Sequence, residues 1–140
     1  MREQAENTNG KNEDMDSPIL LFVYGSLLRG EANHRLLETA EFVGPAGTPP
    51  EYRLVDLGPY PGLVAAGGTA VLGEVYQVPP GLIPRLDRLE DHPDVYVRSD
   101  IRLDDGRPVV TYLLREHLAL GKPEVSTGDW RLHLRTRPSK

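Results

Sequence analysis

Hydrophobic positions along the chain fall mostly into short unbroken or alternating runs, a pattern that predicts strands. The longest unbroken run covers residues 19–23 and ends at Tyr24-Gly25-Ser26-Leu27. A run of this kind that is bounded by glycine predicts a strand buried on both faces. Gly25 lets the backbone turn where a larger side chain would clash, so the following N–H groups can point into a cavity. We therefore expect this strand to end in amide donors that can hold an oxygen atom of a ligand.

The remaining pattern predicts further strands and two helices. Strands are expected over residues 41–43, 52–57, 71–78, 96–103 and 108–114, with a brief pairing at 63–64 after a loop at 58–62. Asp104-Asp105-Gly106 predicts the turn of a hairpin, and Gly73 predicts a bulge or a close approach. The helices are expected over residues 32–38 and about 81–90, the latter with Pro84 in its first turn. This arrangement predicts an α+β fold, a small and mostly antiparallel β-barrel, closed or nearly closed, with flanking helices.

The distribution of charge separates the two ends of the chain from its middle. The formal net charge of −5 argues against a nucleic-acid binder, because phosphate binding needs an excess of Lys and Arg. Acidic residues dominate before Pro18, and residues 131–140 carry basic residues and no acid. We predict a disordered leader at 1–17, one domain at 18–130 and a basic, solvated C-terminal tail at 131–140. A tail that touches a membrane or RNA is the alternative.

The residues and segments that the sequence lacks exclude several kinds of functional site. The chain has no cysteine, which excludes disulfides, thiolate nucleophiles and Cys-based metal sites. Its histidines lack metal-ligand spacing, so we predict no metal and no cofactor. Residues 1–17 have no apolar region typical of a signal peptide, and no apolar stretch approaches the roughly 20 residues that span a bilayer. We expect a cytoplasmic protein with a small-molecule partner and without nucleic-acid or membrane binding; the oligomeric state stays open.

Glu90 is the one acid on the apolar face of the second predicted helix. At about 100° per residue, it falls within the arc formed by Leu82, Ile83, Leu86 and Leu89. Burial in this arc and the helix C-terminus both raise the pKa of a carboxyl group, toward the near-neutral value of a general acid/base. Glu90 is then expected to face a cavity shared with the amides of the first loop. The alternative is a frayed last turn, in which Glu90 turns to solvent or pairs with Arg98.

Other residues with candidate chemistry have simpler interpretations. Ser26 and His34 do not form a predicted nucleophile and base, because Gly25-Ser26-Leu27-Leu28 lacks the Gly-x-Ser-x-Gly pattern. Ser26 is expected to cap a turn or to bind substrate through its hydroxyl group. Tyr112 lies in an apolar strand, typical of a core residue whose hydroxyl group needs a partner. Trp130 is expected to be a packing anchor.

An ordered set of short motifs resembles the gamma-glutamylcyclotransferase-like superfamily. Its first members are Tyr24-Gly25-Ser26-Leu27, Asn33-His34, Tyr60-Pro61-Gly62 and Gly73-Glu74-Val75-Tyr76. Leu86-Asp87-Arg88-Leu89-Glu90, Tyr96-Val97-Arg98, Thr111-Tyr112 and Ser126-Thr127-Gly128-Asp129-Trp130 follow in the family's order. The resemblance covers the chain from Leu21 to Trp130, and the short length is most similar to the gamma-glutamylamine cyclotransferase branch and its small bacterial relatives.

The resemblance implies a reaction and a set of site residues. The reaction is cleavage of a gamma-glutamyl amide by internal attack of its alpha-amino group, which releases 5-oxoproline and a free amine without a cofactor. The catalytic acid/base would be Glu90, and the substrate would contact Tyr24, Gly25, Ser26, Leu27 and Tyr112. The family's glutamate is usually followed by a small residue, often glycine, whereas Asp91 follows here. Two alternatives stay open: a non-catalytic binding or interaction module on the same fold, and an amide hydrolase that uses water in the same pocket.

Overall fold

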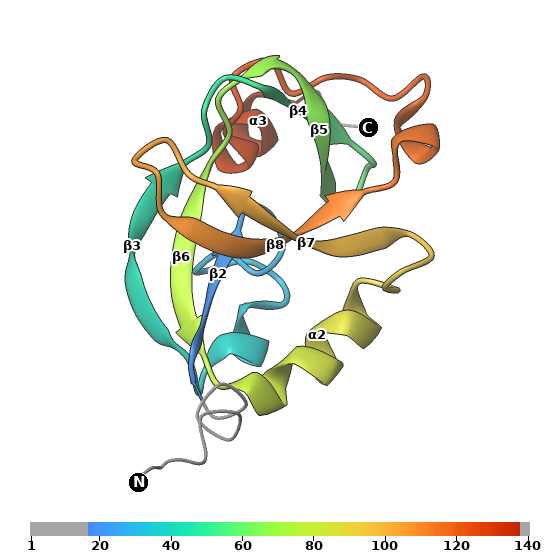
Figure 1. Cartoon of the computed structure of the whole chain (residues 1–140). Coiled ribbons are helices and arrows are strands. Elements are labelled where there is room, and N and C mark those ends of the chain that lie inside the picture. The colour runs from blue at the N-terminus through green and yellow to red at the C-terminus, as the bar shows by residue number, and fades with distance from the viewer. Residues whose placement is uncertain (1–16, 138–140) are drawn as a thin grey trace, which may run out of the picture.

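Seven strands form one mixed sheet in the computed structural model of the protein, which describes residues 17–137 (Figure 1). The strands are β2 (Ile19–Val23), β3 (Glu41–Gly47), β4 (Tyr52–Asp56), β5 (Pro61–Thr69), β6 (Leu72–Val78), β7 (Tyr96–Arg102) and β8 (Pro108–Leu114). The helices are α2 (Ile83–Leu89) and α3 (Trp130–Thr136), which lie at opposite ends of the molecule (Figure 1). Short 3₁₀ turns are η1 (His34–Leu37), η2 (Pro80–Leu82) and η3 (Glu116–Ala119). The predicted leader lies outside the described residues up to position 16.

The sheet confirms the predicted α+β class. Its strand order is β3-β6-β2-β8-β5-β4, with β7 paired to β8. Because β7 occupies one edge of β8 over its whole length, β2 and β5 share the other edge, and both run parallel to β8. All other strand pairs are antiparallel. The turn at residues 104–106 joins β7 and β8 as predicted.

The sheet differs from the expected barrel in that it is not closed. β3 and β4 stand at opposite ends of the strand order. The outer edge of β4 is covered by the segment before α3, which is not a strand. There the N–H of Asp56 donates to the carbonyl of Pro123 (2.8 Å), and the N–H of Val125 donates to the carbonyl of Leu54 (2.7 Å). These bonds satisfy the edge of β4, so it needs no further strand.

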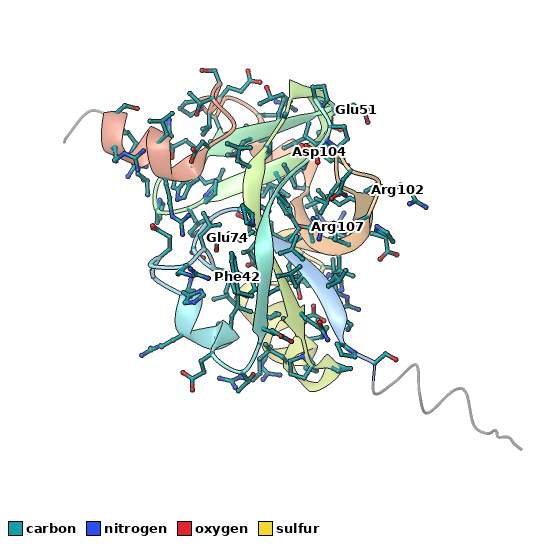
Figure 2. All side chains as sticks on the ribbon, turned by 90° about the vertical axis from the view of Figure 1, so that its left-hand side faces the viewer. Phe42, Glu51, Glu74, Arg102, Asp104 and Arg107 are labelled. Carbon is teal, nitrogen blue, oxygen red and sulfur yellow. The ribbon has the colours of Figure 1, made fainter. Side chains whose placement is uncertain are left out.

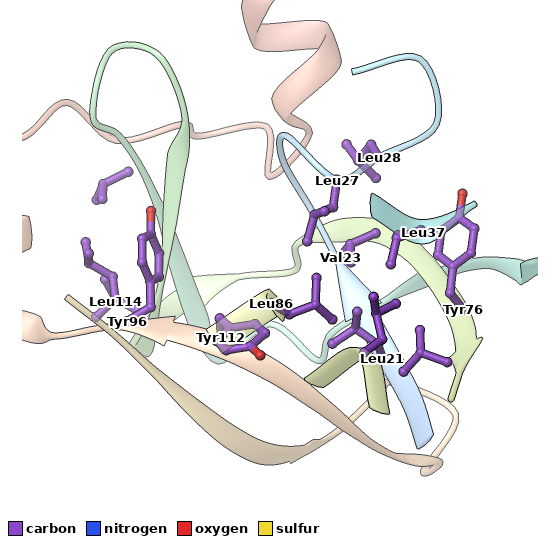
Figure 3. Close-up of a cluster of buried hydrophobic side chains, with 14 of the residues drawn as sticks. Leu21, Val23, Leu27, Leu28, Leu37, Tyr76, Leu86, Tyr96, Tyr112 and Leu114 are labelled. Carbon is purple, nitrogen blue, oxygen red and sulfur yellow. The ribbon is translucent and has the colours of Figure 1, made fainter. Parts of the chain in front are cut away.

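Strand β2 is buried on both faces, as its sequence predicts. Leu21 and Val23 pack into one hydrophobic cluster together with Leu86 of α2 and Tyr112 of β8 (Figure 3). Phe22 and Tyr24, which alternate with them, pack into a second cluster with Leu54, Leu63, Val75 and Trp130. Side chains of successive strand residues point to opposite faces, so β2 serves both clusters. The loop that follows β2 therefore starts from a rigid point between two packed layers.

Three elements differ in length from the sequence prediction. The helix expected over 32–38 is only the 3₁₀ turn η1, and the Asn33 side chain before it binds Ser26 and does not cap the turn. β3 continues past Val43 to Gly47 through a bulge between Phe42 and Gly44. β5 extends to Thr69, far beyond the pairing expected at 63–64. In β3 and β5, sheet pairing outweighs the local preference of glycine and proline for loops.

The second helix and Gly73 agree with their predictions. Residues 80–89 form η2 followed by α2, with Pro84 in the first turn of α2 and Glu90 as its C-cap. A Cβ atom on Gly73 would lie 2.1 Å from the carbonyl oxygen of Val23, which is the expected close approach. No helix within residues 17–137 is long and apolar enough to cross a membrane.

The chain beyond Trp130 forms helix α3 up to Thr136, which differs from the solvated tail expected there. The Asp129 side chain caps this helix by accepting from the N–H of Leu132 (3.2 Å). Trp130 is 2% exposed and anchors the helix in the second cluster, as predicted. Basic side chains of α3 and of the residue that follows it then meet acidic side chains of the sheet, contacts that residues far apart in the sequence make only after folding.

Candidate active site

A pocket of about 150 Å³ lies where the loop after β2 meets the C-terminal end of α2. The residues that the sequence predicts for the site all line it: Tyr24, Gly25, Ser26, Leu27, Glu90 and Tyr112. The other lining residues are Phe22, Val23, Asn33, Tyr60, Pro61, Leu89, Asp91, Val95 and Tyr96. Segments that are far apart in the sequence thus meet around one cavity, while the predicted roles of their residues stay predictions.

The loop after β2 is held by its own contacts and by Pro61. The N–H of Leu28 donates to the carbonyl of Gly25 (3.0 Å), which closes a turn. A Cβ atom on Gly25 would lie 2.6 Å from the ring carbons of Pro61. Glycine is therefore needed here because the rigid proline ring packs directly on the backbone. This contact also joins the loop to the start of β5.

Ser26 is tied to Asn33 through both backbone and side chain. The carbonyl of Ser26 accepts from the N–H of Asn33 (2.8 Å), and its Oγ accepts from Asn33 Nδ2 (2.9 Å). His34 Nδ1 lies 3.0 Å from the carbonyl oxygen of Leu27 and not against Ser26, which agrees with the rejection of a Ser-His pair. The N–H groups of Gly25, Ser26 and Leu27 have no acceptor within residues 17–137. The three residues line the pocket, and their N–H groups are not used within the described part of the chain.

Three tyrosines build the wall of the pocket with hydroxyl groups that already have partners. Tyr24 donates to the carbonyl of Tyr112 (2.6 Å), and Tyr96 donates to the carbonyl of Pro61 (2.7 Å). Tyr112 donates to Oδ1 of Asp87 (2.7 Å), which supplies the partner that its burial requires. Burial raises the pKa of all three phenols well above the usual value. They stay neutral near pH 7, and each hydroxyl group donates to another group of the protein.

Glu90 borders the pocket at the end of α2, and within residues 17–137 its carboxyl group has no hydrogen bond and no ion pair. Its backbone N–H donates to the carbonyl of Leu86 (3.0 Å), which keeps the last turn of the helix closed. Arg98, the predicted alternative partner, instead pairs with Asp87. Burial, together with the negative charge of Asp91, raises the pKa of Glu90 to about 7. This value suits a group that takes up and returns a proton near neutral pH.

A buried carboxylate on β6 fixes the far end of the same loop. Glu74 Oε1 accepts from the N–H of Arg29 (2.9 Å) and from the hydroxyl of Tyr76 (2.9 Å). Its Oε2 lies 3.2 Å from Nη1 of Arg131 on α3, and Arg131 also donates to the carbonyl of Arg29. Glu74 faces the β3 side of the molecule near Phe42 (Figure 2). Burial alone would raise the pKa of Glu74, but these donors outweigh it and hold the pKa below the usual value.

A second cluster fixes the loop that brings Tyr60 and Pro61 to the pocket. Asp56 Oδ2 lies 2.7 Å from Nε2 of His133, and Asp56 Oδ1 accepts from the N–H of Gly58 (2.7 Å). Arg137 donates to the carbonyl of Gly58 (2.6 Å). Helix α3 therefore contacts the supports of both loops that line the cavity.

Four residues of the site or its support were not predicted from the sequence: Asn33, Tyr60, Tyr96 and Glu74. All four belong to motifs that carry the family resemblance, and this was the available signal. The motifs do not tell where the side chains point, because that depends on strand pairing. Within residues 17–137, no group of three or more His, Cys, Asp or Glu residues is arranged to hold a metal ion.

Comparisons with known proteins agree with this architecture. The family described as gamma-glutamyl cyclotransferase, AIG2-like, matches residues 21–132. A putative gamma-glutamylcyclotransferase of Vibrio cholerae is 43% identical over 111 residues, which cover 79% of this chain and 94% of that protein. Gamma-glutamylaminecyclotransferase A of Danio rerio is 38% identical over 94 residues, 61% of this chain and 58% of that protein.

Two solved structures share this fold. A crystal structure of a protein specific to uropathogenic E. coli has a TM-score of 0.77 at 29% identity, covering 87% of this chain and 99% of that one. A mouse AIG2-like protein has a TM-score of 0.69 at 28% identity, covering 79% of this chain and 87% of that one. Since the family match spans most of the chain and includes the pocket, the protein belongs to the gamma-glutamyl cyclotransferase, AIG2-like family.

Proposed function

We propose that the protein cleaves a gamma-glutamyl amine by internal cyclisation and releases 5-oxoproline and a free amine. The observation that carries this proposal is the position of Glu90, which lines the same cavity as residues 25–27. The pKa of this carboxyl group, about 7, supports a role in proton transfer. The names of the similar proteins from Vibrio cholerae and Danio rerio support the same class of reaction.

In the proposed reaction, Glu90 first acts as a base. Its carboxylate takes a proton from the alpha-ammonium group of the substrate, and the neutral nitrogen attacks the gamma-carbonyl carbon. A C–N bond forms in the five-membered ring, and the carbonyl oxygen becomes an oxyanion. The N–H groups of Gly25, Ser26 and Leu27, which have no acceptor within the described residues, are suited to stabilise this oxygen.

Glu90 then acts as an acid. It returns the proton to the departing nitrogen, the original amide C–N bond breaks, and the carbonyl double bond forms again. The ring nitrogen, which carries one extra proton after the attack, releases it to the freed amine or to water, and this gives 5-oxoproline. The pocket contributes by holding the substrate folded on itself, which brings its two reacting atoms together. In this proposal the rings of Tyr24 and Tyr112 contact the glutamyl part, and their hydroxyl groups maintain the wall.

The proposal is tested by incubating the purified full-length chain with a panel of gamma-glutamyl amides and measuring 5-oxoproline and glutamate by chromatography. We expect 5-oxoproline from at least one amide. Glu90→Gln should lower the rate by about 10²- to 10⁴-fold, the usual contribution of a general acid/base. Circular dichroism of the variant should show an unchanged fold.

The alternatives give different products. Glutamate in place of 5-oxoproline would identify a hydrolase that uses water as the attacking group. Binding of the amides without any product would identify a binding module. Full activity of Glu90→Gln would remove Glu90 from the mechanism even if 5-oxoproline is formed.

A further inference from the structure

Asp87 lies on α2 about one turn before Glu90, and two side chains of the sheet bind its carboxylate. Its Oδ1 accepts from the hydroxyl group of Tyr112 on β8 (2.7 Å), and its Oδ2 pairs with Nη1 of Arg98 on β7. Arg98 and Tyr112 stand directly opposite each other in the pairing of β7 with β8. Residues in such a pair point to the same face of the sheet, so both can reach one carboxylate. Burial alone would raise the pKa of Asp87, but these two partners outweigh it and hold the pKa below the usual value.

The backbone of Asp87 also holds the segment that follows Glu90. Its carbonyl accepts from the N–H of His92 (2.9 Å), and Nδ1 of His92 accepts from the N–H of Arg98 (3.0 Å). The segment from Asp87 to Arg98 is thus a loop whose ends are joined by an ion pair and whose middle is bound at His92. Glu90 lies inside this loop, and its carboxyl group has no hydrogen bond or ion pair of its own within the described residues. The position of Glu90 therefore depends on the contacts that hold the loop.

Tyr112 continues this connection toward the loop after β2. Its carbonyl accepts from the hydroxyl group of Tyr24 (2.6 Å), and the hydroxyl oxygen of Tyr24 accepts from the N–H of Leu63 (3.3 Å). Tyr24 is the last residue before residues 25–27, so one row of hydrogen bonds runs from α2 through β8 to the start of that loop. This row connects the two parts of the pocket, namely Glu90 and residues 25–27.

We propose that Asp87 is a positioning residue, which holds Glu90 at the distance from residues 25–27 that proton transfer needs. This inference rests on the proposed function. Asp87 is not among the residues that line the pocket, so it acts without touching the substrate. A base must lie within hydrogen-bond reach of the proton that it takes, and a misplacement of about 1 Å can lower a rate by about 100-fold. Loss of Asp87 should therefore slow proton transfer and leave substrate binding largely unchanged.

The test measures kcat and KM for release of 5-oxoproline from an amide that the unmodified protein cleaves. Asp87→Ala suits a helix and removes both side-chain contacts, so kcat should fall roughly 10- to 100-fold while KM stays close to its original value. Asp87→Asn keeps an oxygen that accepts from Tyr112 and should retain more of kcat than Asp87→Ala. Asp100→Asn is the matched control, since Asp100 is an exposed aspartate of β7 whose side chain has no hydrogen bond or ion pair within the described residues. It should leave kcat and KM unchanged.

Repeating Asp87→Ala in a Glu90→Gln protein separates positioning from a general structural effect. If Asp87 acts through Glu90, the second substitution should add little to the loss that Glu90→Gln already causes, because residues that act as a unit have non-additive effects. The same additional loss as in the unmodified protein, an unchanged kcat in Asp87→Ala, or a rise in KM alone overturns the inference and leaves the proposed reaction intact. Circular dichroism checks the fold, and if Asp87→Ala is unfolded, Asp87→Asn takes its place in the same comparison.

A nuclear magnetic resonance titration of the Glu90 carboxyl carbon tests the inference without any reaction. The protein is labelled with carbon-13 glutamate, and the signal of Glu90 is the one that Glu90→Gln removes. Tyr112→Phe removes the hydroxyl group that binds Asp87 and changes no charge. In this variant the pKa of Glu90 should fall from about 7 toward 4.5, because a released end of α2 lets water reach the carboxyl group.

An unchanged pKa of Glu90 in Tyr112→Phe overturns the inference. Absence of 5-oxoproline from every amide contradicts the proposed reaction instead. The titration then decides the positioning by itself, and a lowered pKa supports it.

Discussion

Glu90 occupies a position where its negative charge is unfavourable. The carboxyl group is partly buried, has Asp91 as a neighbour and has no cationic partner within the described residues. A group of this kind lowers the stability of the fold whenever it is ionised, and such a cost is typical of residues kept for function. The effect depends on pH, which makes it measurable without a substrate.

Glu90→Gln is expected to stabilise the protein at high pH. The pKa of Glu90 is about 7 in the folded state against 4.5 ordinarily, so the folded state binds the proton more tightly than the unfolded state. The free energy of unfolding therefore falls as pH rises from about 4.5 to about 7. The variant avoids this loss and should exceed the unmodified protein by about 1–3 kcal/mol at pH 8, with little difference near pH 4.

Urea unfolding at the two pH values measures this difference. Glu38→Gln serves as the control, because Glu38 is an exposed glutamate outside the pocket. Its effect on stability should be small and nearly the same at both pH values. A Glu90→Gln variant that is equally or less stable than the unmodified protein at pH 8 would show that burial does not disfavour the charge.

At the scale of elements, α3 supports the two loops that form the pocket. Arg131 reaches Glu74 and Arg29 at the end of the loop after β2, and Arg137 reaches Gly58 in the loop before β5. The sequence shows these side chains only as a run of basic residues at the end of the chain. Their partners lie on β4 and β6, so the supporting role depends on tertiary contacts.

Arg131→Met is expected to weaken this support. The variant keeps a long apolar side chain but removes the ion pair to the buried Glu74 and the hydrogen bond to Arg29. We expect a loss of about 1–3 kcal/mol in the free energy of unfolding, since a buried carboxylate loses a donor. In an assay for 5-oxoproline, kcat/KM should also fall because the loop amides are less firmly placed.

Arg135→Met on the same helix is the matched control. Arg135 is exposed, and no ion pair or hydrogen bond of its side chain occurs within residues 17–137. Its effect on stability should stay within about 0.5 kcal/mol, as is usual for such surface positions. Equal effects of the two variants would contradict a special role of Arg131.

At the scale of the whole molecule, β2 joins the two hydrophobic clusters into one cooperative unit. Leu21 and Val23 belong to the first cluster, and Phe22 and Tyr24 belong to the second. Loss of one cluster would expose one face of a strand that the other cluster needs. We therefore expect the described part of the chain to unfold in a single transition.

The single tryptophan allows the expected single unfolding transition to be tested. Trp130 reports on the second cluster by fluorescence, and far-ultraviolet circular dichroism reports on the whole sheet. The two urea unfolding curves should coincide, and Phe22→Ala should shift both by about 3–5 kcal/mol, as expected for a buried phenylalanine. Two separate midpoints in either protein would show that the clusters unfold independently.

The sequence determined the features that depend on local pattern. The unbroken run before Gly25 predicted the doubly buried strand, and helical spacing placed Glu90 on the apolar side of its helix. Hydrophobic periodicity contains this information because the position of a residue along a strand or helix determines the face to which its side chain points. Ordered motifs added the family and the list of candidate residues.

The tertiary structure decided which segments that are far apart in the sequence come into contact. It decided that the sheet stays open, since the segment before α3 covers the edge of β4. It also decided that Glu90 and the loop after β2 share a cavity, and that basic residues at the end of the chain pair with Glu74 and Asp56. These outcomes depend on hydrogen bonds and charge pairs between residues far apart along the chain, and a single sequence has no local signal for such pairs.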